Sequence, residues 1–158
     1  MSSADNIQHG GSHYKEGGEL QHWNMAAANG LGYFESAATK YVTRWRKKAG
    51  LLDLEKAGHY HDKLLELAYL GAACPVQTHR PLIELGLGAG LRRRVLDRVD
   101  MGAYAKANGL NELEDRYCRL VVEWSDTASL DTLEEAREVL RELLEGAHAD
   151  AQEGRAFS

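Results

Sequence analysis

An internal repeat constrains the fold of this chain more than any other feature of its sequence. When the 158-residue chain is shifted by 79 positions, more than a third of the 43 positions from 24 to 66 are identical, without a gap. Composition alone would give roughly three identities. The segment 28–31 returns as 107–110, Trp45 returns as Trp124, and 64–66 returns as 143–145. The chain therefore contains two copies of one structural unit.

Each copy carries the apolar spacing of amphipathic helices. Val42, Trp45 and Ala49 stand at i, i+3 and i+7, and a second stripe follows at Leu54, Ala57, His61, Leu64 and Leu65. His61 is replaced by Leu140 in the second copy, which predicts that this position faces the core. Asp53 and Thr132 are expected to cap the helices that follow them. Helices are predicted over 20–29, 33–48, 53–70, 91–107, 111–124 and 132–147.

The predicted fold is all-α, with two pseudo-symmetric helical repeats packed into one compact protein through their Trp45 and Trp124 faces. The first unit, with an N-terminal arm, spans residues 1–70. A linker over 71–90 contains both prolines, and the second unit spans 91–158.

Charge and hydropathy narrow the function classes. The net charge of -5 argues against a general nucleic-acid coat, so duplex nucleic acid is not an expected partner. No apolar run approaches the roughly 20 residues that span a bilayer, and no signal peptide is visible, so we expect a cytoplasmic protein without a membrane partner. The number of copies in the assembly stays open, and a homo-oligomer is compatible with the sequence.

The clearest difference between the copies is a basic helix face in the first. Residues 40–48 hold five basic side chains and no acid. Lys40, Arg44 and Lys47 stand at i, i+4 and i+7, so their head groups project from one face, where bound phosphate would relieve their repulsion. The second copy has Glu123 in place of Arg44. This loss favours an anion site over the alternative, a solvated basic face at a favourable helix end.

Other patterns indicate simpler roles. His59 and His61 are two residues apart and do not share a helix face, so no metal pair is predicted. The glycine-rich segment 86–90 lacks the Lys-Ser/Thr of a P-loop and is interpreted as linker. Glu134, Glu135, Glu138 and Glu142 form a solvated acidic face, or a magnesium site of the kind used by helical pyrophosphohydrolases.

Several short motifs of the first copy occur in the order of a known family. They are His13-Tyr14, then Lys40-Tyr41-Val42-x-Arg44-x-Arg46-Lys47-Lys48, then Asp53-Leu54-x-Lys56-Ala57, and finally Tyr60. Over residues 13 to 66 the chain resembles a phage family of domains without assigned function that includes the nucleotide kinase of T-odd coliphages. Where that family has Gly-Asn before the basic helix, this chain has Glu35-Ser36.

The resemblance implies a phage protein in the host cytoplasm that transfers a phosphoryl group to (deoxy)nucleoside monophosphates without a P-loop. His13 and Asp53 are then the catalytic candidates, with Mg²⁺ accompanying the nucleotide. The expected ligand contacts are Tyr14, Lys40, Tyr41, Arg44, Arg46, Lys47, Lys48, Lys56 and Tyr60. Two alternatives remain: a non-enzymatic module that sequesters a nucleotide signal, and an adaptor whose basic face docks an acidic protein.

Overall fold

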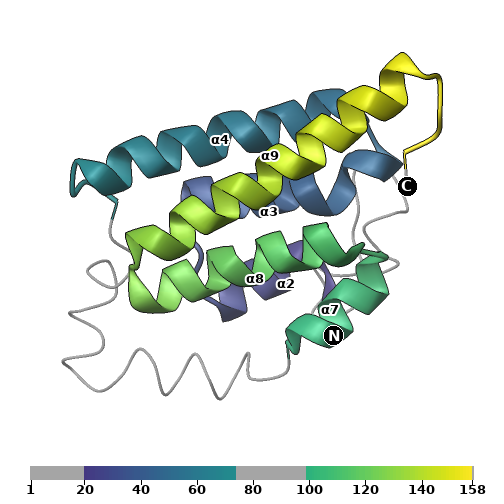
Figure 1. Ribbon diagram of the computed structural model, residues 1–158. Helices are drawn as coiled ribbons and strands as arrows, with labels where there is room; N and C mark the ends of the chain where they lie inside the picture. Colours follow the sequence, from purple (N-terminus) through teal and green to yellow (C-terminus); the bar gives the residue numbers. More distant parts are fainter. Residues whose placement is uncertain (1–19, 74–98, 158) are drawn as a thin grey trace.

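The computed structural model describes residues 20–73 and 99–157, and the described residues form helices and connecting turns without a strand (Figure 1). The all-α prediction is confirmed for this part of the chain. The predicted linker 71–90 and the start of the predicted helix 91–107 lie largely outside the described residues. The helices are α2 (His22–Ala28), α3 (Tyr33–Arg44), the short 3-10 helix η3 (Trp45–Lys47), α4 (Leu51–Tyr69), α7 (Met101–Asn108), α8 (Glu112–Thr127) and α9 (Leu130–Gln152).

The helices pack as two antiparallel pairs that lie against each other. α3 packs on α4, and α8 packs on α9. The two pairs meet through α4 against α9 and through α3 against α8, while α2 and α7 flank the pairs (Figure 1). The starting residues of α2, α3 and α4 precede those of α7, α8 and α9 by 79 positions each. No helix in residues 20–73 or 99–157 combines the length and apolar character that a membrane span requires.

The turn between α3 and α4 depends on a glycine. α3 tightens into η3, and the amide of Gly50 then donates to the carbonyl of Trp45 at 2.8 Å. Gly50 has φ +58° and ψ -134°, a backbone conformation that is strained for every residue with a Cβ. This residue is also the N-cap of α4, so the predicted cap at Asp53 is wrong, and Asp53 is the third residue of the helix.

The second pair begins with side-chain caps. Asn111 accepts from the amide of Glu114, while the Glu114 side chain accepts from the Asn111 amide, which is a capping box. Ser129 caps α9 by accepting from the amide of Thr132, so the predicted cap at Thr132 is also wrong, by three residues. Ala128, the residue before Ser129, has a left-handed conformation with φ 54° and ends α8.

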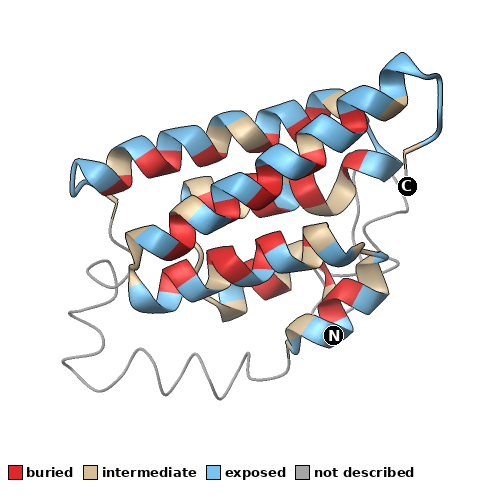
Figure 2. Cartoon of the chain, in the orientation of Figure 1, coloured by how far each residue is buried: buried red, intermediate tan, exposed pale blue. Residues whose placement is uncertain are grey.

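The core lies between the two pairs, where their buried stripes face each other (Figure 2). One cluster gathers Trp45 and Val42 with Val121, Tyr117 and Leu140, and a second gathers Trp124 with residues such as Leu64 and Leu133. The tryptophans therefore belong to separate clusters.

His61 is fully buried, as its place in the apolar stripe predicted. Its Nε2–H donates to the carbonyl of Leu133 at 3.0 Å, and its Nδ1 accepts from the hydroxyl of Tyr117 at 2.9 Å. Both ring nitrogens are satisfied in the neutral form, and burial lowers the pKa of His61. This histidine is a core residue.

Candidate functional site

The predicted ligand residues lie on α3, η3 and α4 or, for Lys48, directly after η3, except for His13 and Tyr14, which lie outside the described residues. Most of the others lie in four settings. These are an open pocket, a buried ion pair, a junction between the two helix pairs, and a stack of aromatic rings. Only some of the predicted residues surround a space that a ligand could enter.

Lys40, Arg44 and Lys47 line one open pocket with a volume of about 40 Å³. Its other lining residues are Gln21, His22, Thr43 and Asn108, so residues of α2, α3, η3 and the end of α7 line it. A single water needs roughly 10–15 Å³ of such space, so the pocket has room for about three water-sized groups. We call this site, defined by Lys40, Arg44 and Lys47, the basic pocket.

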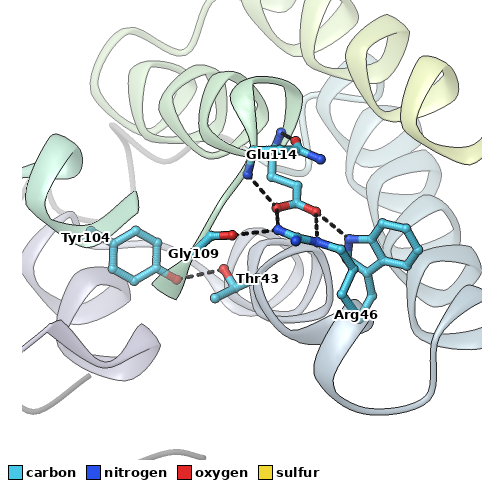
Figure 3. Close-up of polar contacts among 7 residues, drawn as sticks. Thr43, Arg46, Tyr104, Gly109 and Glu114 are labelled. Atoms are coloured by element: carbon cyan, nitrogen blue, oxygen red, sulfur yellow. Dashed lines mark hydrogen bonds and ion pairs between the residues drawn. The ribbon is translucent and has the colours of Figure 1, made fainter. Parts of the chain in front are cut away.

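Two neutral side chains of the basic pocket are fixed by hydrogen bonds. The Thr43 hydroxyl and the Tyr104 hydroxyl are 2.7 Å apart (Figure 3). The side-chain Nδ2 of Asn108 donates to the backbone carbonyls of Leu20 and Tyr104 at 3.0 and 2.9 Å. Thr43 and Asn108 are therefore held in place by their contacts with Tyr104 and with the backbone.

His22 belongs to the basic pocket, and no sequence pattern identified it. Thr39 uses its hydroxyl hydrogen on the carbonyl of Glu35 at 2.8 Å, so the His22 Nε2–H must donate to Thr39 Oγ1, also at 2.8 Å. Burial, together with the nearby charges of Lys40 and Arg44, lowers the pKa of His22 to about 3. The imidazole is thus neutral at physiological pH, and the positive charge of the pocket comes from its lysines and arginine.

Asp53 lies in a buried ion pair. Arg44 Nε donates to its Oδ2 at 3.0 Å, and Arg44 Nη2 donates to its Oδ1 at 3.4 Å. Lys56 Nζ is 3.9 Å from the same carboxylate, whose side chain is 1% exposed. This pair fixes the arginine at the edge of the basic pocket. Asp53 is therefore a positioning residue in this geometry, since its oxygens are engaged by the two cations.

Arg46 lies at the junction between the helix pairs (Figure 3). Its Nε and Nη2 donate to the two carboxylate oxygens of Glu114 at 2.9 and 2.6 Å, and Nη2 also donates to the carbonyl of Gly109 at 2.6 Å. Glu114 is fully buried. Such a fork is a strong structural contact, so Arg46 holds α8 in place and is not among the lining residues of the basic pocket. Lys48, which follows η3, is exposed and does not line the pocket either.

Tyr41 and Tyr60 stack with ring centroids 5.8 Å apart. The guanidinium carbon of Arg44 is 4.8 Å from the Tyr41 ring centroid, and Lys56 Nζ is 5.7 Å from it. Tyr33 and Phe34 extend this group, because each ring contacts Tyr60. The sequence pattern did not identify these two residues. They are 27 and 26 residues before Tyr60, and only the packing of α3 on α4 brings them next to it.

Within the described residues, no group of three or more histidine, cysteine, aspartate or glutamate side chains is arranged to hold a metal ion. Comparison of the chain with protein-family models, with curated proteins and with solved structures finds no match.

Proposed function

We propose that this chain binds a nucleotide or a related phosphorylated ligand, with a phosphate group in the basic pocket. The observation that carries this proposal is the convergence of Lys40, Arg44 and Lys47 on one open pocket of about 40 Å³. Like charges that face the same space repel each other, and a bound phosphate would turn that repulsion into attraction.

The rigidity of the basic pocket supports this proposal. Arg44 is anchored by the buried Asp53, and Asn108 is anchored by two backbone carbonyls. A cation held in place loses little side-chain entropy on binding, so more of its electrostatic attraction appears as affinity. Because His22 is neutral at physiological pH, the positive charge that would attract an anion does not depend on the protonation of this histidine.

The geometry favours binding without turnover, because the carboxylate of Asp53 is engaged by Arg44 and Lys56. The chain would then act as a module that sequesters a nucleotide. Phosphoryl transfer, with Mg²⁺ accompanying the nucleotide, is the second candidate, since the same three cations would neutralise charge that develops on a transferred phosphoryl group. An adaptor role would leave the basic pocket without a small-molecule ligand.

We also infer that the two halves are a fused duplication and that the second half has lost the site. Trp45 donates to Glu114, and its counterpart Trp124 donates to Glu35, the counterpart of Glu114. Asn29 and Asn108 likewise each donate to the backbone carbonyl four residues earlier. At the positions of Lys40, Arg44 and Lys47 the second half has Arg119, Glu123 and Asp126.

The test is a thermal-shift screen against nucleoside mono-, di- and triphosphates and cyclic dinucleotides, with and without Mg²⁺, followed by product analysis of every hit. A ligand at about 100 times its Kd adds roughly 2.7 kcal/mol to the free energy of unfolding. Stabilisation without conversion supports the sequestering module, and conversion supports phosphoryl transfer. No stabilisation by any compound would overturn the proposal.

Variants locate the binding. The double substitution Lys40→Ala and Lys47→Ala should abolish the thermal shift, because both side chains line the basic pocket. The matched control is Lys63→Ala, which removes an exposed lysine of α4 that pairs with Glu66. Equal loss of binding in the control would place the ligand elsewhere.

A further inference from the structure

We propose that the ligand of this site is a single-stranded oligonucleotide, with a phosphate in the basic pocket and an unpaired base stacked on the exposed Tyr33, which ends a row of aromatic rings that begins beside the pocket. This inference rests on the proposed function. We call this row the tyrosine face; it consists of Tyr33, Phe34, Tyr41 and Tyr60, with Arg44 and Lys56 at its edge.

The rings of the tyrosine face contact one another with Tyr60 in the middle, and Tyr41, Tyr60 and Phe34 are partly buried against the core while Tyr33 is exposed. The Tyr60 centroid is 5.9 Å from that of Tyr33, 5.8 Å from that of Tyr41 and 6.4 Å from that of Phe34. Tyr33 is 70% exposed, although an aromatic ring gains free energy by leaving water. Its ring therefore offers an accessible surface on which a flat apolar ligand can stack.

Arg44 connects this surface to the basic pocket. It lines the pocket, and its guanidinium carbon lies 4.8 Å from the centroid of Tyr41. A phosphate held by Arg44 would thus have an aromatic ring at the distance of an attached nucleoside. The path continues from Tyr41 through Tyr60 to Tyr33, in two further steps of nearly 6 Å each. Because Tyr41 and Tyr60 stack on each other, the accessible ring is Tyr33 at the end of this row, and a strand with one phosphate in the basic pocket would reach it with a base further along the strand.

Cations that alternate with aromatic rings are the chemistry that binds single strands. The backbone phosphates pair with basic side chains, and each exposed base stacks on a ring, whatever its sequence. A duplex offers phosphates without free base faces, so it would use the basic pocket alone. The negative net charge of the chain also limits nucleic-acid binding to this one surface.

The second half of the chain has no aromatic ring at the equivalent positions. The residues 79 positions after Tyr33, Phe34, Tyr41 and Tyr60 are Glu112, Leu113, Leu120 and Val139. Those after Arg44 and Lys56 are Glu123 and Glu135. α8 and α9 form with none of the aromatic rings or cations at these positions. Tyr41, Tyr60 and Phe34 pack partly against the core, as Leu120 and Val139 do in the second half, so the exposed Tyr33 is the ring that helix packing does not explain.

The experiment measures the affinity of the full chain for a labelled oligothymidylate by fluorescence anisotropy, with thymidine monophosphate and a blunt duplex as competitors. We expect the oligonucleotide to bind at least about tenfold more tightly than the monophosphate, because each stacked base adds free energy. Tyr33→Ala should weaken oligonucleotide binding about tenfold, leave the monophosphate affinity unchanged, and leave the melting temperature unchanged. Tyr33→Phe should behave as the unsubstituted chain.

Tyr69→Ala is the matched control, since Tyr69 is a 60% exposed tyrosine at the far end of α4. An oligonucleotide affinity no higher than that of the monophosphate would overturn this inference and leave the proposed function standing. The same holds if the duplex competes equally well, or if Tyr33→Ala and Tyr69→Ala have the same effect. Failure of both the oligonucleotide and the monophosphate to bind would overturn the proposed function as well.

Discussion

The indole Nε1 of Trp45 donates a 2.7 Å hydrogen bond to Oε1 of Glu114, a carboxylate fully buried between the two helix pairs. The same carboxylate accepts from Arg46 and from the amide of Asn111, so η3 and the start of α8 meet at one side chain (Figure 3). The contact joins the end of α3 to the start of α8. A buried charge is stable only when it is paired and hydrogen-bonded, and these donors satisfy that condition.

Arg46→Ala is expected to lower the free energy of unfolding by about 3 kcal/mol, because it leaves a buried carboxylate without its cation. It should leave ligand affinity unchanged, since Arg46 does not line the basic pocket. Urea denaturation measures the first effect, and the thermal shift with a saturating ligand measures the second. Lys47→Ala is the matched comparison and should show the reverse pattern. A loss of affinity in Arg46→Ala at unchanged stability would return this arginine to the ligand site.

The two tryptophans should differ in what their polar atoms contribute. Trp45→Phe leaves Glu114 with Arg46 and the Asn111 amide, whereas Trp124→Phe removes the hydrogen bond that Trp124 donates to the buried Glu35 at 3.1 Å. The structure gives Glu35 no arginine in the position that Arg46 takes toward Glu114, because Ser125 stands there and bonds to the carbonyl of Asn29. Trp124→Phe should therefore cost about 1–2 kcal/mol more than Trp45→Phe, as measured by urea denaturation. Equal costs would contradict this assignment.

Much of this fold follows from local pattern. The 3.6-residue spacing of Val42, Trp45, Leu54 and Leu64 indicated which faces are buried, and His61 was placed in the core because its counterpart is Leu140. The helix starts were less accurate. Asp53 has the side chain of a good cap, yet Gly50, with its positive φ, begins α4 three residues earlier. Backbone conformation at a glycine is not visible in a polarity pattern.

The candidate site was predictable only where its residues share one helix face. The i, i+4, i+7 spacing of Lys40, Arg44 and Lys47 is a local property, and the structure places all three around the basic pocket. Arg46 looked equivalent in sequence, but its partner Glu114 lies 68 residues away. His22 and Tyr33 were missed for the same reason, since their neighbours are brought to them by the packing of other helices.

Stability should fall as the pH drops below about 6.5, with His22 as one cause. Its pKa is lowered to about 3 in the folded chain, so between those values the unfolded chain binds a proton that the folded chain does not. The contribution of neutral His22 is thus complete above pH 6.5 and is lost as the pH falls toward 3. His61, whose pKa is also lowered by burial, acts in the same direction.

Urea denaturation from pH 8 to pH 4 tests this dependence. His22→Met, which copies Met101 of the second half, should flatten the profile relative to the unsubstituted chain. His59→Gln changes an exposed histidine of α4 and serves as the control. Parallel profiles for His22→Met and the unsubstituted chain would show that His22 is not held neutral by the fold.

The contact between Phe157 and the α3–α4 turn should be measurable as a coupling energy. The Phe157 ring lies 4.9 Å from that of Trp45, and a Cβ added to Gly50 would be 3.0 Å from Phe157 Cε2. Phe157→Ala should cost about 1–2 kcal/mol through lost ring contacts. Gly50→Ala should cost more than the roughly 1–3 kcal/mol of an alanine in a sparsely populated backbone region, because the methyl group also meets the ring.

In the double variant Gly50→Ala with Phe157→Ala the ring is absent, so the alanine at position 50 should cost only the free energy of its strained backbone conformation. The two changes should therefore be less destabilising together than the sum of the single changes. Purely additive costs would mean that the ring moves aside freely, and the end of the chain would then contribute nothing to the conformation of the turn. The control pair is Gly71→Ala with Phe157→Ala: Gly71 also has positive φ, at +69°, but a Cβ there meets nothing within 4 Å, so those two costs should add.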